Sequence, residues 1–184
     1  MNDMQVPREE EFAALLEGRE ARRDLQKELL GEHAWVLQIC LNLPGLPKHL
    51  PGDLECLGVT EKALLRRIPP LAAASRRFCD NGAGKALLFG GSRPSPREVK
   101  KACIVLEEEL PWGRLLDLDV ISSEGGLSRS ELGLPPRQCL LCREEAKICA
   151  RRGSHGFEEL RLRAQELLSL ALTGASPHAG KSSP

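Results

Sequence analysis

One stretch of the chain, from Leu110 to His155, concentrates groups that a buried core cannot use. It holds two aspartates in a DLD triplet, several arginines, three cysteines and a histidine. Charged side chains are almost never fully buried unless they are paired. We therefore expect this stretch to form the functional part of the protein, around which the rest of the chain is organised.

The flanking segments alternate between strand-like and helical hydrophobic patterns. Period-two alternation predicts a strand over residues 35–43, and shorter strands are predicted over 86–89, 115–122 and 127–130. Apolar residues at helical spacing predict helices over residues 9–30, 60–68, 71–78, 96–110 and 157–172. In the last of these helices, Phe157 is expected to belong to the buried stripe. A capping box in Ser95-Pro96-Arg97-Glu98 marks the start of the fourth helix.

This order of elements predicts an α+β protein with a small mixed sheet and with helices near both ends of the chain. A length of 184 residues suits one domain, which we expect to span residues 1–174. Residues 175–184 are small and polar, so we expect a disordered tail.

Composition narrows the class of protein. The formal net charge is zero, which gives no argument for nucleic acid as the main partner. No run approaches the roughly 18 apolar residues of a membrane span, and the polar, acidic start does not resemble a signal peptide. Seven cysteines, an odd number, do not suggest a disulfide framework. We therefore expect a cytoplasmic protein that binds neither nucleic acid nor membrane.

Asp117 and Asp119 are two residues apart in a predicted strand, so both project from one face. Two adjacent carboxylates repel each other unless a cation lies between them, and an apolar setting raises their pKa unless a metal or an arginine compensates. Such a pair at a strand end is a common way to hold Mg²⁺ against a triphosphate. Taken alone, a solvent-facing strand edge explains the DxD pattern better.

The neighbours of the pair favour the functional interpretation. Gly113 allows close backbone approach, and Arg114 supplies a planar donor fork that suits phosphate. More arginines follow in the same stretch: Arg129, Arg137, Arg151 and Arg152.

A Cys3His set follows, with two, six and five residues between its successive members: Cys139, Cys142, Cys149 and His155. The first pair fits a knuckle around Zn²⁺, and a turn of helix can deliver the later two ligands. A reduced CxxC of redox type, or cysteines packed at a helix start, also fits the pattern.

The same residues carry a family resemblance. PWGRLLDLDV, LSRSELGLPPRQCLLC and ICARRGSH closely resemble the apo-citrate lyase phosphoribosyl-dephospho-CoA transferase family, also called holo-citrate lyase acyl carrier protein synthases. The helix LLEGREARRDLQKELL and the segment LNLPG resemble it more loosely. Over residues 51–101 only the order of elements is similar, and Pro69-Pro70 departs from the family pattern.

The resemblance implies a nucleotidyltransferase-type enzyme. Such an enzyme moves the phosphoribosyl-dephospho-CoA group from triphosphoribosyl-dephospho-CoA to a serine of the citrate lyase acyl carrier (gamma) subunit, and pyrophosphate leaves. Asp117 and Asp119 would be catalytic and hold Mg²⁺. The donor would be bound by these residues: Gly113, Arg114, Arg137 and Arg151.

Two points stay open at this level. The proton of the serine could pass to a metal-polarised carboxylate or to His155, if His155 is not a zinc ligand. Two other classes of protein also fit the motifs: a non-catalytic, zinc-stabilised module that binds a carrier protein, and a DxD glycosyltransferase. The glycosyltransferase is disfavoured because no nucleotide-binding βαβ unit is recognisable near the start.

Overall fold

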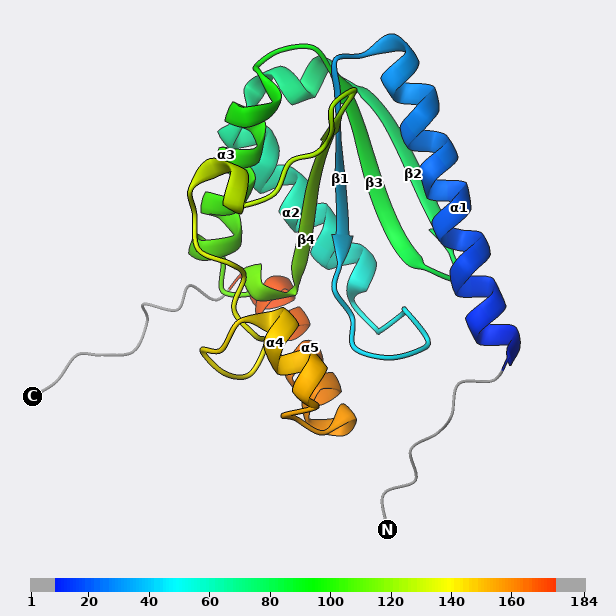
Figure 1. The fold of residues 1–184 in the computed structure, drawn as a ribbon, viewed down its shortest axis with the longest axis vertical. Helices are drawn as coiled ribbons and strands as arrows, with labels where there is room; N and C mark the ends of the chain where they lie inside the picture. The colour runs from blue at the N-terminus through cyan, green and yellow to red at the C-terminus, as the bar shows by residue number, and fades with distance from the viewer. Residues whose placement is uncertain (1–8, 175–184) are drawn as a thin grey trace, which may run out of the picture.

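A computed structural model describes residues 9–174, in which helices surround a single β-sheet (Figure 1). The helices are α1 (Glu9–Glu32), α2 (Asp53–Arg67), α3 (Pro96–Glu109), α4 (Ala146–Arg152) and α5 (Phe157–Thr173). The strands are β1 (Trp35–Leu41), β2 (Ser75–Asn81), β3 (Gly84–Gly91), β4 (Leu116–Ser122) and β5 (Gly125–Gly126). Three short 3-10 turns are η1 (Pro69–Ala73), η2 (Gly113–Leu115) and η3 (Ser130–Leu132).

The expected α+β class is confirmed by this set of elements. The domain boundary expected after residue 174 coincides with the end of the described residues, so it stays a prediction. The expected disordered tail, residues 175–184, lies outside the described residues, as do residues 1–8. No helix within residues 9–174 is both long enough and apolar enough to cross a membrane.

The strands follow the order β2-β3-β1-β4-β5, with β1 at the centre. Every pairing between these strands is antiparallel, so the expectation of a mixed sheet was wrong. Tight turns join β2 to β3 and β4 to β5, and only antiparallel neighbours can be joined so closely.

The two faces of the sheet are covered differently. Trp35, Leu37 and Ile39 of β1 point into the main core, which also includes residues of α2, α3 and α5. Val36 and Cys40 point into a smaller core with Leu29 and other residues beneath α1. Figure 1 shows α1 alongside β2 and β3, with α2 passing on the other side of the sheet. The main core therefore lies on one face, and the face shared with α1 is less fully covered.

The segment between β1 and β3 differs from the expected pattern. α2 begins at Asp53 rather than at residue 60, and the helix expected over residues 71–78 is wrong. Proline lacks a backbone donor and restricts the residue before it, so Pro69 and Pro70 confine the chain to the turn η1. From Ser75 onward exposure alternates residue by residue, because β2 is an edge strand with one solvated face.

Two further local expectations were wrong. The return strand expected over residues 127–130 is reduced to β5, extended only by a hydrogen bond from the Leu127 N–H to the Val120 carbonyl (2.8 Å). Phe157, expected in the buried stripe of α5, is 41% exposed. Its ring lies so close to Gly45 that a Cβ there would be 1.9 Å from Phe157 Cε2. This aromatic ring packs on a loop glycine instead of entering the core.

Candidate functional site

Asp117 and Asp119 lie on the central part of β4, on the face of the sheet shared with α1. The pairing register places Asp117 opposite Cys40 and Asp119 opposite Gln38 of β1. The alternate residues of β4 are fully buried on the other face: Leu116, Leu118 and Val120. The two carboxylate side chains are 41% and 52% exposed. The strand therefore fixes both carboxylates in place while leaving them open to a ligand, as the two-residue period predicted.

Polar residues of β1 extend this site across the sheet. The Cys40 thiol donates to Asp117 Oδ2 (3.7 Å), and Gln38 Nε2 donates to Cys40 Sγ (3.7 Å). Gln26 of α1 donates in turn to Gln38 Oε1 (2.8 Å). Burial, followed by the charge of Asp117, raises the pKa of Cys40 well above its usual range, so the thiol stays protonated as a donor.

These partners of Asp117 were not predicted from the sequence, although the sequence contains a signal for them. Gln38 and Cys40 are polar positions, two residues apart, in an otherwise apolar strand. Only the register with β4 shows what they contact.

Lys100 of α3 is a buried cation beside the second carboxylate. Its Nζ donates to the Leu118 carbonyl (2.6 Å) and lies 3.8 Å from Asp119 Oδ1. Partial removal from water and the charge of Asp117 raise the pKa of Asp119, and Lys100 opposes that rise. Asp119 therefore holds a proton more readily than an ordinary aspartate. The only sequence signal for Lys100 was its place beside the apolar stripe of α3.

Two arginines lie on either side of β4 in the sequence, and only one of them contacts the aspartate pair. Arg137 donates to Asp117 Oδ1 (3.3 Å) and to the Arg114 carbonyl (3.0 Å). Arg114 instead directs its guanidinium at the loop that carries the cysteines, where it donates to Gln138 Oε1 (2.8 Å) and the Cys139 carbonyl (3.2 Å). The structure thus brings Arg137 to the aspartate pair and ties Arg114 to that loop.

The other residues expected in the site have different surroundings. A Cβ on Gly113 would lie 2.1 Å from the Glu107 carbonyl oxygen, so packing against the end of α3 explains this glycine. Arg151 is exposed on α4. Arg129 is engaged by Glu107 (2.6 Å) and Glu108 of α3. That Gly113 and Arg151 bind the phosphoribosyl-dephospho-CoA donor stays a prediction.

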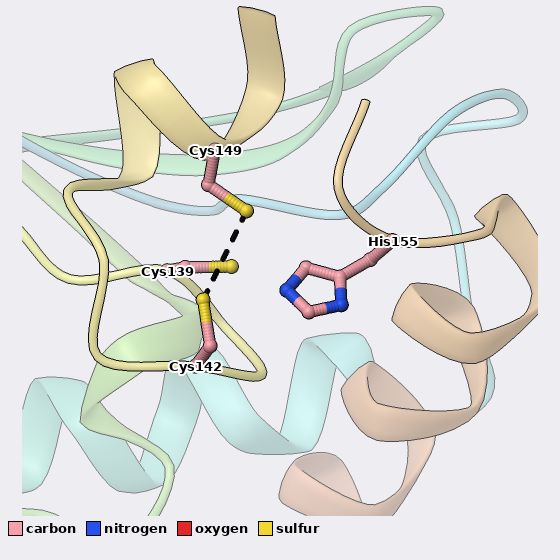
Figure 2. Close-up of side chains that lie close together, drawn as sticks. All are labelled: Cys139, Cys142, Cys149 and His155. Atoms are coloured by element: carbon pink, nitrogen blue, oxygen red, sulfur yellow. Dashed lines mark hydrogen bonds between the residues drawn. The ribbon is translucent and has the colours of Figure 1, made fainter. Parts of the chain in front are cut away.

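The three cysteines and the histidine converge, as Figure 2 shows. They come from the loop before α4, from α4 itself and from the turn before α5: Cys139, Cys142, Cys149 and His155. One potential ligand atom of each lies within 4.8 Å of those of the other three. Within residues 9–174, no other group of three or more His, Cys, Asp or Glu side chains brings all its ligand atoms this close to one another. This set could hold a metal ion.

The thiols of this cluster have uneven acidity. Although burial works in the opposite direction, hydrogen bonds from the backbone N–H groups of Cys142 and Leu141 help to lower the pKa of Cys139 to about 7. A turn whose N–H groups point at a sulfur favours the thiolate, which is the form that binds a metal.

The fold and these two clusters define a small α+β protein with a carboxylate pair on an open sheet face and a thiol–imidazole cluster beside it. The family model for apo-citrate lyase phosphoribosyl-dephospho-CoA transferases matches residues 10–170. The match includes residues 51–101, where the resemblance depended only on the order of elements. The chain belongs to this family.

Individual relatives agree with the family model. A probable apo-citrate lyase phosphoribosyl-dephospho-CoA transferase of Streptococcus pyogenes serotype M18 is 35% identical over 169 residues, covering 86% of this chain and 85% of the relative. The apo-citrate lyase phosphoribosyl-dephospho-CoA transferase of Shigella flexneri serotype 5b is 34% identical over 147 residues, covering 75% of this chain and 80% of the relative.

Proposed function

We propose that this protein transfers a phosphoribosyl-dephospho-CoA group to apo-citrate lyase. The single observation that carries the proposal is the pair Asp117 and Asp119, half exposed and flanked by Arg137 and Lys100, in a chain of this family. In its finer form the proposal names triphosphoribosyl-dephospho-CoA as donor and a serine of the acyl carrier (gamma) subunit as acceptor.

The residues present fit a magnesium-dependent reaction. Mg²⁺ is usually held by one or two carboxylates together with substrate phosphates, so two adjacent and accessible aspartates are a sufficient protein contribution. Asp117 and Asp119 would be these ligands. Bound Mg²⁺ would neutralise part of the charge of the donor's polyphosphate.

Of the arginines, Arg137 is the best placed to bind the phosphates of triphosphoribosyl-dephospho-CoA. A guanidinium has five N–H donors, and Arg137 uses two of its nitrogens in the bonds to Asp117 and to the Arg114 carbonyl. The remaining donors are free to bind phosphate oxygens next to the aspartate pair. Arg114, which precedes β4 and whose carbonyl accepts a hydrogen bond from Arg137, would support Arg137 and contact the outer phosphates.

The acceptor serine must lose a proton as its oxygen attacks. We assign that proton to Asp119, because both carboxylate oxygens of Asp117 already accept hydrogen bonds, one from Arg137 and one from Cys40. The serine oxygen bonds to the phosphorus nearest the ribose, and the bond from that phosphorus to pyrophosphate breaks. His155, the other candidate base, lies among the thiols, which favours Asp119 for this role.

We also propose a cytoplasmic location, which is supported by the thiols. All seven cysteines are free, as is usual in reducing compartments.

The test is the intact mass of the apo-acyl carrier subunit after incubation with donor, Mg²⁺ and this protein. We expect a mass gain equal to the prosthetic group, together with one pyrophosphate per modified carrier. Binding of the carrier with no mass gain would instead support the non-catalytic module and would overturn the proposed transfer.

A further inference from the structure

We propose that the segment following β5 is held in place by a structural zinc ion with four ligands: Cys139, Cys142, Cys149 and His155. The ion would in turn fix Arg137 against Asp117. The assignment of the metal is independent of the transferase proposal, and only its consequence for Arg137 rests on that proposal.

The segment that follows β5 has almost no core of its own. Within residues 121–160, all of them described, the only buried residues are Cys139 and Cys149. The regular elements there are the end of β4, β5, η3, α4 and the first turn of α5. Burial of apolar area is the main force that orders a chain, and here it is small, because Leu127 and Leu140 pack against the main core but are only partly buried. Two buried thiols, one in a polar loop and one on the short helix α4, need another source of stability.

The spacing of the four ligand atoms is close to that around a zinc ion. A tetrahedral zinc ion with Zn–S distances of about 2.3 Å places its sulfurs about 3.8 Å apart. Cys142 Sγ and Cys149 Sγ are 4.0 Å apart, and all four ligand atoms lie within 4.8 Å of one another. A disulfide would need about 2.05 Å between sulfurs, and the cysteines are free thiols. The spacing therefore fits four ligands around one ion.

The orientation of the His155 ring also favours a bound metal ion. Its Nε2 is buried without a hydrogen-bond partner, whereas its Nδ1 lies 3.6 Å from Glu159 Oε2, one helical turn further along the chain. A histidine that binds a metal usually directs its other ring nitrogen at a carboxylate or carbonyl, which orients the ring. Figure 2 shows the imidazole facing the three sulfurs. A metal ion would satisfy the Nε2 atom that has no other partner.

The backbone is folded so that it can present these ligands. The Cys139 N–H donates to the Glu144 carbonyl (2.8 Å), and the Ala146 N–H donates to the Arg137 carbonyl (2.8 Å), which closes a tight turn around the first two cysteines. Gly153 has a positive φ of 60° and ends α4, so the chain turns back toward His155. Four protein ligands leave no open position, which is typical of a structural site.

The consequence for the sheet site follows from Arg114. Its Nη1 donates to the carbonyls of Cys139 and Cys142, so the guanidinium is attached to the backbone of two ligands. Arg137 directly precedes this knuckle and reaches Asp117. Zinc would therefore act as a positioning element for the phosphate-binding arginines.

Metal content is the direct test. The full-length protein purified without chelator should contain about one zinc per chain. With Co²⁺ in its place, it should show thiolate-to-cobalt charge transfer and the intense visible bands of a tetrahedral ion. Cys142→Ser should lower the affinity for zinc more than about 100-fold. The matched control Cys79→Ser changes a cysteine of β2 outside the cluster and should keep the metal.

A variant that keeps four metal ligands distinguishes the loss of zinc binding from unfolding of the protein. His155→Cys supplies a fourth thiol, so it should retain zinc and shift the cobalt spectrum toward stronger charge transfer. Metal-free protein with no cobalt spectrum would overturn the proposal. Equal zinc content in the wild type and in Cys142→Ser would overturn it as well, because the ion would then be bound elsewhere.

The positioning role is tested by steady-state kinetics. Zinc-depleted protein should show at least about a tenfold higher KM for the donor, with a smaller change in kcat, because the arginines lose their support. Unchanged kinetics after zinc loss would remove this role. A zinc-loaded protein that never labels the carrier would instead contradict the proposed function and leave the zinc site standing.

Discussion

The aspartate pair and the thiol–imidazole cluster are close in sequence but are held in different ways. Asp117 and Asp119 belong to a strand whose backbone is paired with β1 along its whole length and whose other side chains fill the main core. The four residues of the cluster lie in a segment with two buried residues and little regular structure. The sheet and the core hold the aspartate pair in position, whereas the cluster depends on contacts among its own residues.

This difference predicts how each site responds when its side chains are lost. A carboxylate removed from β4 leaves the strand register and the core unchanged, so function should fail without unfolding. A ligand removed from the cluster takes away much of what orders its segment, so structure should fail there first. Substitutions and metal removal test this contrast, and their expected effects range from a large loss of transfer to a small loss of stability.

Asp117→Asn should give the largest change, a loss of transfer of roughly 1,000-fold or more, because it removes a charge that would hold Mg²⁺. Thermal unfolding should stay within about 0.5 kcal/mol of the wild type, as for an accessible side chain. Carrier mass after a fixed incubation measures the loss. The control Asp24→Asn changes an exposed carboxylate on α1 and should leave transfer intact. Full activity of Asp117→Asn would show that the pair is a plain strand edge.

Removal of metal by a chelator should change the cluster and spare the sheet. Amide hydrogen exchange over residues 137–155 should accelerate roughly 100-fold or more, because the segment has little buried apolar area to keep it closed. Amides of β1 and β3 serve as the internal control and should exchange at unchanged rates. If amide exchange accelerated equally in residues 137–155 and in the sheet, the cluster and the aspartate pair would not differ in how they are held.

Arg137→Lys should have an intermediate effect, a rise of about tenfold in the KM for the donor. A single ammonium group cannot reproduce a planar fork that bonds both to Asp117 Oδ1 and to the Arg114 carbonyl. Initial rates over a range of donor concentrations measure the change. Arg143→Lys, an exposed position in the same loop, is the control. An unchanged KM would place the donor away from Arg137.

Lys100→Met should change the pH dependence rather than abolish activity. The Lys100 cation lowers the pKa of Asp119, so its removal raises that pKa. Asp119 must be deprotonated to accept the serine proton, and the acid limb of kcat/KM should therefore move to higher pH. Lys101→Met, an exposed neighbour on α3, should leave the profile in place. An unmoved acid limb would exclude Asp119 as the base.

Ser95→Ala should have the smallest effect on function. The Ser95 hydroxyl accepts from the Glu98 N–H (3.4 Å), and the Glu98 carboxylate accepts from the Ser95 N–H (2.9 Å). Loss of this cap should cost about 1 kcal/mol and lower Tm by about 2–4 °C, with transfer unchanged. Ser169→Ala on the exposed face of α5 should leave Tm near that of the wild type. A strong loss of transfer on loss of the cap would mean that α3 contributes to the site by more than packing.

Local patterns predicted the elements that a short stretch of chain can specify. The capping box before α3 and the strands β1 and β4 appear where they were expected, although β1 ends at Leu41 and is buried on both faces. The mixed sheet, the helix over residues 71–78, the strand over residues 127–130 and the buried Phe157 were wrong. Each of those depended on pairing or packing with distant parts of the chain.

The features of the candidate site also fall into those that local sequence predicts and those that depend on tertiary structure. The sequence by itself determined that Asp117 and Asp119 share a face and that four zinc-type ligands have the spacing of a knuckle, because backbone geometry and covalent spacing act over a few residues. Only the tertiary structure decided that Gln38, Cys40 and Lys100 flank the pair. It also decided that Arg137 reaches Asp117 while Arg129 is held by α3. Strand register and helix packing bring such partners together, and no local pattern contains that information.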